Sequence, residues 1–161
     1  MLGNIAEQNT DNSAIVNTND GKTCIASFDH HSLRNIAPGD PVVVNPTGRK
    51  TSPFYWISAS APCTYYRRYW EEDSGDLCSG WGGSHFLFEV HTDGCVSRQI
   101  QLFDNGKFLV YDEICEEDEF GGRSTVPLDL AEYEAFTISK GEFFDHWDPD
   151  SSENRRPKPG G

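Results

Sequence analysis

The chain has 161 residues, a formal net charge of −13, 36% hydrophobic residues and 12% aromatic residues. This length suits one domain with a proper core or two small lobes, and the aromatic content predicts a core built from a few large rings. The negative charge disfavours nucleic acid and anionic membranes as partners. It suits a basic protein partner or simple solubility.

The sequence also lacks the common targeting and cofactor patterns. No apolar run approaches the roughly 18 residues of a membrane helix, and the N-terminus does not look like a signal peptide. Phosphate-loop, dinucleotide-binding, HExxH and GxSxG patterns do not occur, so we expect no cofactor and no metal. The five cysteines form no CxxC pair, which favours reduced thiols in a cytoplasmic protein: Cys24, Cys63, Cys78, Cys95 and Cys115.

The first part of the chain predicts a small β lobe. Residues 1–12 are polar and are expected to be disordered. A hairpin is expected across Asn19-Asp20-Gly21, and short strands follow the Ala37-Pro38-Gly39-Asp40-Pro41 turn. The lobe is therefore expected to cover residues 13–60, with strands at 13–18, 22–28, 42–45 and 54–59.

Asp29, His30 and His31 form the one local group that suggests catalysis or metal binding. They could supply metal ligands or a general base, with Cys24 as a further candidate. Loop histidines are more often exposed bystanders. A small metal-dependent or cysteine-using enzyme is therefore kept as an alternative, and the chain is expected to be non-catalytic.

Residues 61–84 are expected to form an aromatic and Gly-rich connection. This segment opens with an alternation of rings and guanidinium groups, which is typical of interface anchors and of single-strand stacking surfaces. The other interpretation is an ordinary strand with its rings half in the core. The candidate binding residues are Tyr65, Tyr66, Arg67, Arg68, Tyr69 and Trp70, and the acidic residues Glu71, Glu72 and Asp73 follow them directly.

Residues 85–148 predict an antiparallel meander followed by a helix. Three-residue turns at Thr92-Asp93-Gly94 and Asp104-Asn105-Gly106 place apolar residues of neighbouring strands together. The expected cross-strand pairs are Val90 with Val96, Phe88 with Arg98, Phe86 with Ile100, Leu102 with Phe108, Ile100 with Val110, and Arg98 with Asp112. The last pair is expected to be a structural ion pair.

An acidic run and a capped helix follow the meander. Glu116, Glu117, Asp118 and Glu119 are expected to form either a solvated loop or a contact patch for a basic partner. A short helix or turn is expected at 127–136. Ser139 is expected to cap an aromatic helix at 142–147 that packs Phe143 and Trp147 on the apolar face of the meander. Residues 149–161 are expected to be a disordered tail.

The second half of the chain contains a series of features in a characteristic order: Glu89, Arg98, Phe103-Asp104-Asn105-Gly106, Tyr111, and Ile138-Ser139-Lys140-Gly141-Glu142-Phe143 through Trp147. In these features residues 89–147 resemble a bacterial family of small domains of unknown function, whereas the first 84 residues match nothing recognised. The resemblance implies a fold and no catalytic residue. Small acidic domains of this kind are similar to immunity proteins and other partners of bacterial toxins.

The sequence thus predicts a mostly β member of the α+β class, with an antiparallel meander, a short C-terminal helix and a preceding β lobe. The expected function is a soluble, acidic, non-catalytic binding protein, of immunity or inhibitor type, that docks on a basic protein. The alternatives are the small enzyme and a β-barrel binder of single-stranded nucleic acid that uses residues 65–70. The oligomeric state stays open.

Overall fold

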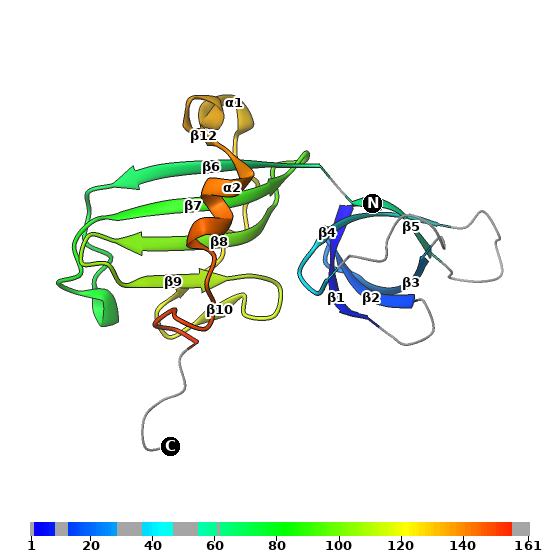
Figure 1. Ribbon diagram of the computed structural model, residues 1–161, viewed down its shortest axis with the longest axis horizontal. Helices are drawn as coiled ribbons and strands as arrows, with labels where there is room; N and C mark the ends of the chain where they lie inside the picture. The colour runs from blue at the N-terminus through cyan, green and yellow to red at the C-terminus, as the bar shows by residue number, and fades with distance from the viewer. Residues whose placement is uncertain (1, 9–12, 29–36, 47–54, 61, 156–161) are drawn as a thin grey trace, which may run out of the picture. The chain divides into compact units, whose positions relative to one another are not determined.

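The computed structural model describes residues 2–8, 13–28, 37–46, 55–60 and 62–155. The chain forms two compact units, Met1–Cys63 and Thr64–Gly161 (Figure 1). It is mostly β, with antiparallel sheets and a short C-terminal helix, which confirms the predicted fold class. In the part of the chain that the structure describes, no helix has the length and apolar character needed to cross a bilayer.

The first unit is a closed five-stranded barrel with the strand order β1-β2-β3-β5-β4. Its strands are β1 (Leu2–Gln8), β2 (Ser13–Thr18), β3 (Thr23–Phe28), β4 (Pro41–Pro46) and β5 (Tyr55–Ser60). One parallel pair, β3 with β5, and the antiparallel pair β1 with β4 close the barrel. Alternate residues of the strands fill the core with small aliphatic side chains, all fully buried: Ile5, Ala14, Val16, Ala26, Val42 and Val44.

The N-terminal residues correct one sequence prediction. Residues 2–8, expected to be disordered, form strand β1 and pair with both β2 and β4. The polar groups of β1 find hydrogen-bond partners because the barrel closes around them. The buried side-chain amide of Asn4, for example, donates to the Gly39 carbonyl at 3.0 Å. The other four strands of the lobe lie close to the predicted ranges.

The second unit is built on a five-stranded sheet with the order β12-β6-β7-β8-β9. Its strands are β6 (Cys63–Trp70), β7 (Ser84–His91), β8 (Val96–Phe103), β9 (Phe108–Tyr111) and β12 (Thr137–Ile138). Residues 61–84, expected to be a connection, therefore supply a whole strand of the sheet, followed by the short 3-10 helix η1 (Asp76–Cys78). The alternative interpretation of this segment as an ordinary strand is the observed one.

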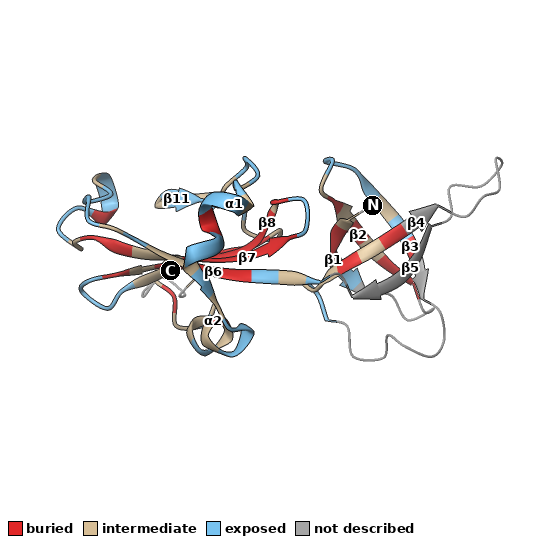
Figure 2. Ribbon diagram, turned by 90° about the horizontal axis from the view of Figure 1, so that it is seen from above, coloured by how far each residue is buried: buried red, intermediate tan, exposed pale blue. Residues whose placement is uncertain are grey.

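Both faces of this sheet are covered, and Figure 2 shows it nearly edge-on with α1 and α2 on opposite sides. Helix α1 (Leu130–Tyr133), the 3-10 helix η2 (Glu134–Phe136) and the small ribbon of β10 (Glu117–Asp118) and β11 (Gly121–Gly122) follow the meander. Helix α2 (Lys140–His146) comes last. Its N-cap is Ser139, whose hydroxyl accepts from the Glu142 amide at 3.1 Å, as predicted.

The two turns of the meander have the predicted lengths. Val90 pairs with Val96, and Leu102 pairs with Phe108. Gly94 and Gly106 close the turns at φ angles of 88° and 86°, a conformation that favours glycine.

The predicted register between β7 and β8 is wrong beyond the first pair. Ser97 is an extra residue in β8, and this bulge pairs Glu89 with Arg98 and Phe88 with Gln99. As a result Phe88 packs on Tyr133 of α1, whereas Arg98 lies against Phe144 and Trp147 on the α2 side. Phe88 and Arg98, predicted to share a face, therefore lie on opposite faces.

The C-terminal segment gives a further correction. Residues 149–155 are ordered against β9, although they were expected to be part of a disordered tail. The Ser152 side chain is fully buried, and the Glu153 amide donates to the Phe108 carbonyl at 2.9 Å. Edge strand β9 is thereby covered, which protects its free backbone groups from pairing with another chain. Residues 156–161 lie outside the described residues.

Candidate functional site

The ring and guanidinium groups of β6 do not form one continuous surface. Tyr65 and Tyr66 are buried on opposite faces, against Phe143 and Tyr133 respectively. The next residues alternate in the same way. Arg67 contacts Glu142 on the α2 side, and Arg68 pairs with Glu132 on the α1 side. Because a strand sends successive side chains to opposite faces, the predicted anchor cluster is divided between two covering layers.

Trp70, the last residue of β6, lines a surface pocket of about 310 Å³, named here the Trp70 pocket. Its apolar walls come from Trp70, Phe86 and Phe88. The Trp70 and Phe86 rings are nearly perpendicular, at 83° with centroids 5.2 Å apart, and Phe86 stacks on Phe88 at 5.9 Å. The pocket therefore offers aromatic surface at two angles.

Polar groups complete the Trp70 pocket. Glu72 and Asp73 are exposed, and the hydroxyls of Ser74 and Ser84 both accept from the Gln101 amide, at 2.9 and 3.0 Å. The Asp73 carboxylate accepts from the backbone amides of residues 75 and 80, at 2.8 and 2.9 Å. These hydrogen bonds hold the pKa of Asp73 below its usual range, so this carboxylate is both fixed in place and ionised at neutral pH.

A buried ion pair lies on the α2 side of the sheet. Arg98 donates to both carboxylate oxygens of Glu89 at 3.2 Å, and the two side chains are only 8% and 1% exposed. Tyr65 and Ser97 donate to the same carboxylate, and the Arg98 guanidinium lies 5.7 Å from the Trp147 ring centroid. Glu89, rather than Asp112, is therefore the partner of Arg98, because the bulge at Ser97 places the two side by side.

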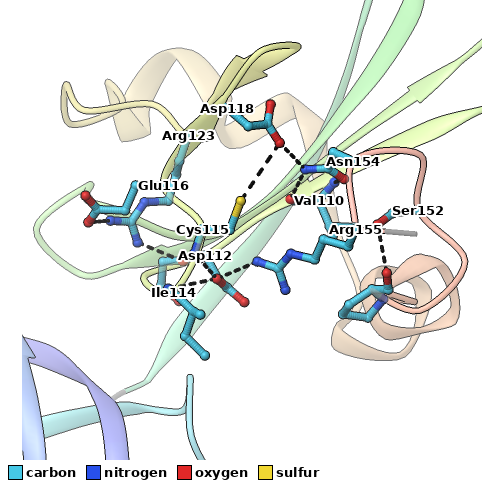
Figure 3. A network of polar contacts seen from close by, with 12 residues as sticks. Val110, Asp112, Ile114, Cys115, Glu116, Asp118, Arg123, Ser152, Asn154 and Arg155 are labelled. Carbon is cyan, nitrogen blue, oxygen red and sulfur yellow. Dashed lines mark hydrogen bonds and ion pairs between the residues drawn. The ribbon is translucent and has the colours of Figure 1, made fainter. Parts of the chain in front are cut away.

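Asp112 belongs instead to a network that ties the C-terminal segment to β9 (Figure 3). Arg155 donates to the Asp112 carboxylate at 2.6 Å, and Asn154 exchanges two hydrogen bonds with the backbone of Val110, at 2.8 and 3.1 Å. Asp118 joins the network through Asn154 at 2.9 Å. These contacts anchor the C-terminal segment and are structural.

The four acidic residues predicted as a contact patch have different surroundings. Asp118 accepts from the Tyr111 hydroxyl at 2.9 Å as well as from Asn154, so it is part of the fold. Glu116 is exposed and pairs with Arg123 at 2.8 Å. Glu117 and Glu119 are exposed on and beside the β10–β11 ribbon. The acidic run is thus an ordered ribbon with three outward carboxylates.

The suggestion that Asp29, His30 and His31 act in catalysis or metal binding stays a prediction. Asp29, His30 and His31 lie outside the described residues. Burial raises the pKa of the Cys24, Cys78 and Cys95 thiols, which disfavours the thiolate that a nucleophilic cysteine needs. All five cysteines are free thiols. Within the described ranges, no group of three or more His, Cys, Asp or Glu side chains is placed to hold a metal ion.

Comparison of the chain with models of known families, with curated proteins and with solved structures gives no match. The resemblance of residues 89–147 to a bacterial small-domain family therefore stays a prediction. Several residues that carry it lie together in the fold, since Tyr65 of β6 contacts both Glu89 and Phe143 while Arg98 contacts Trp147. This cluster is enclosed, since Tyr65, Glu89, Arg98 and Phe143 are all buried.

Sequence reasoning missed the lining of the Trp70 pocket other than Trp70, Glu72 and Asp73. Phe86 and Phe88 were assigned to the face covered by α2, because the bulge at Ser97 has no local sequence signal. The fixed position of Asp73 did have a local sequence signal. Asp73 lies two residues before Gly75, and an aspartate at that spacing favours a turn that its own carboxylate closes.

Proposed function

We propose that the protein is an acidic, non-catalytic binding protein that docks on a basic protein partner, of the immunity or inhibitor type. The observation that carries this proposal is the Trp70 pocket, whose lining combines three aromatic rings with the exposed carboxylates of Glu72 and Asp73. The net charge of −13 supports it, because such a field steers and retains a positively charged surface.

The engagement of the interior carboxylates supports a binding role over an enzymatic one. Glu89, Asp112 and Asp118 each accept hydrogen bonds from neighbouring side chains and serve the fold. Glu72, Glu117 and Glu119 are exposed to the solvent from which a partner would come.

The test is a pull-down from the native host at low and at high salt. We expect one dominant basic protein, bound more weakly as the ionic strength rises, because salt screens exposed charges. Reversing Glu117 and Glu119 to lysine should weaken capture. Asp118 is left unchanged, because its substitution would disturb the Asn154 network. Capture that is indifferent both to salt and to these reversals would overturn the proposal.

A second candidate is the single-stranded nucleic-acid binder. It is favoured by one observation, the closed five-stranded barrel, which is an architecture that OB-fold proteins use to bind oligonucleotides. The charge of the chain and the division of Tyr65–Trp70 between two faces weigh against it. A mobility shift with single-stranded DNA or RNA at low salt would favour it over the basic partner.

A further inference from the structure

We infer that the Trp70 pocket receives the side chain of an arginine or lysine presented by the basic partner. This inference rests on the proposed function and specifies the group that the partner inserts. Its basis is the combination of two aromatic walls, two carboxylates and a size suited to one side chain.

The aromatic walls favour a cation with an apolar stem. The faces of Trp and Phe rings carry negative charge density and attract ammonium and guanidinium groups within about 6 Å. The perpendicular arrangement of Trp70 and Phe86 presents one ring face beside the edge of the next, and Phe88 extends the apolar wall. The methylene groups of an arginine or lysine would pack on these rings while the charged end remains near the rim.

The chain already holds one of its own cations in this way beside the pocket. The Arg68 guanidinium lies 4.8 Å from the Trp70 ring centroid, 5.1 Å from that of Tyr133 and 4.9 Å from that of Phe136. Its charge is balanced by Glu132 at 2.8 Å. An aromatic wall with one carboxylate at its edge is therefore a combination that this sheet uses to bind a guanidinium group.

The rim of the pocket selects for positive charge. Asp73 is fixed by two backbone amides, Glu72 lies exposed beside it, and neither a lysine nor an arginine lines the pocket. Phosphate and carboxylate ligands would therefore be repelled. The volume of about 310 Å³ lies at the lower end of the range for small-molecule sites and is large enough for one arginine or lysine side chain.

The test uses the full-length protein, followed by NMR through its backbone amides and tryptophan indoles. The probes are N-acetyl-arginine methylamide and N-acetyl-lysine methylamide. The matched neutral probe is N-acetyl-citrulline methylamide, which has nearly the shape of the arginine compound without its charge. We expect saturable shifts at Trp70, Phe86 and neighbouring amides, with a dissociation constant on the order of 1 mM for one side chain. Citrulline should bind at least about tenfold more weakly.

Two charge variants separate the pocket from the general field. Glu72→Gln should weaken arginine binding severalfold, whereas Glu119→Gln, which removes the same charge from the ribbon, should leave it unchanged. Phe86→Leu keeps an apolar side chain and should also weaken binding. Equal binding of citrulline, equal effects of the two charge variants, or binding only of a quaternary ammonium such as choline would overturn the inference.

The outcomes also separate this inference from the proposed function. Salt-dependent capture of a basic protein without any shift by the arginine or lysine probe would overturn the pocket assignment and leave the proposed function standing. If the pocket binds both probes but the protein captures no basic partner, the proposed function is overturned and the pocket's preference for a basic side chain stands.

Discussion

The two faces of the sheet in the second unit differ in whether their charged side chains are buried or exposed. Under α2, the carboxylate of Glu89 and the guanidinium of Arg98 are enclosed and bonded to each other. Beside α1, Glu72 and Asp73 remain exposed around an aromatic pocket. Enclosed charges must be paired because their desolvation is costly. An exposed carboxylate such as that of Glu72 contributes little to stability and faces the solvent.

Replacement of Glu89 is the strongest way to test this comparison. Glu89→Gln removes the charge that balances the buried Arg98 and should lower the free energy of unfolding by about 3–5 kcal/mol. Urea unfolding monitored by tryptophan fluorescence measures it. The matched control on the other face is Glu132→Gln, which breaks an exposed pair with Arg68 and should cost less than about 1 kcal/mol. Similar costs for the two variants would contradict the distinction between the faces.

The edge at β9 should give an intermediate effect. Asn154→Ala leaves the backbone amide and carbonyl of Val110 without their side-chain partners, which should cost about 1–3 kcal/mol. The same unfolding experiment measures this, and size-exclusion chromatography reports any pairing of the uncovered edge. Ser151→Ala in the same segment should change stability by less than about 0.5 kcal/mol. A neutral Asn154→Ala variant would mean that the segment does not cover the edge.

The Asp112–Arg155 pair at this edge predicts a pH dependence. Burial acts to raise the pKa of Asp112, but hydrogen bonds from Arg155 and from the amides of Cys115 and Ile114 outweigh burial and hold this pKa below its ordinary value. A carboxyl whose pKa is lower in the folded state stabilises the fold above its unfolded pKa of about 3.9, and this contribution is lost as the pH falls through the folded value.

Unfolding measured from pH 7 to pH 3 checks this expectation. Stability should fall at the acidic end, and Asp112→Asn should flatten that fall while lowering stability at neutral pH. Asp145→Asn, at an exposed position of α2, should keep the slope of the unmodified protein. The prediction fails if the slopes of the Asp112 variant and the unmodified protein coincide.

Replacement of the pocket carboxylate should have the smallest effect on stability. Glu72 is exposed, so Glu72→Gln should change the free energy of unfolding by less than about 0.5 kcal/mol. The urea midpoint measures this. A loss above about 1 kcal/mol would show that Glu72 serves the fold, and the pocket would then lack an available carboxylate at this position.

The sequence predicted those features that depend on neighbours along the chain. The hairpins, the turn lengths closed by Gly94 and Gly106, and the capping of α2 by Ser139 all depend on backbone preferences and hydrogen bonds within a few residues. The mostly β class followed from the alternation of apolar residues.

The candidate site was predicted only in part. Trp70, Glu72 and Asp73 attracted attention through their composition, but nothing local placed Phe86 and Ser84 beside them. The stretch Tyr65–Trp70 looked like one surface because its residues are adjacent in sequence. In a strand, residues that are adjacent in sequence lie on different faces, because successive side chains point to opposite sides of the sheet.

The tertiary structure alone decided three features: the bulge at Ser97, the exchange of partners that pairs Arg98 with Glu89, and the return of residues 149–155 to β9. Each depends on groups far apart in the sequence. Arg155 and Asp112 are separated by 43 positions, and Tyr65 reaches Glu89 across 24. The sequence by itself determined the strands and turns of the meander, four strands of the first unit and the charge of this protein. Which face each side chain occupies, and therefore which charges are enclosed and which remain exposed, was fixed only when distant strands came into register.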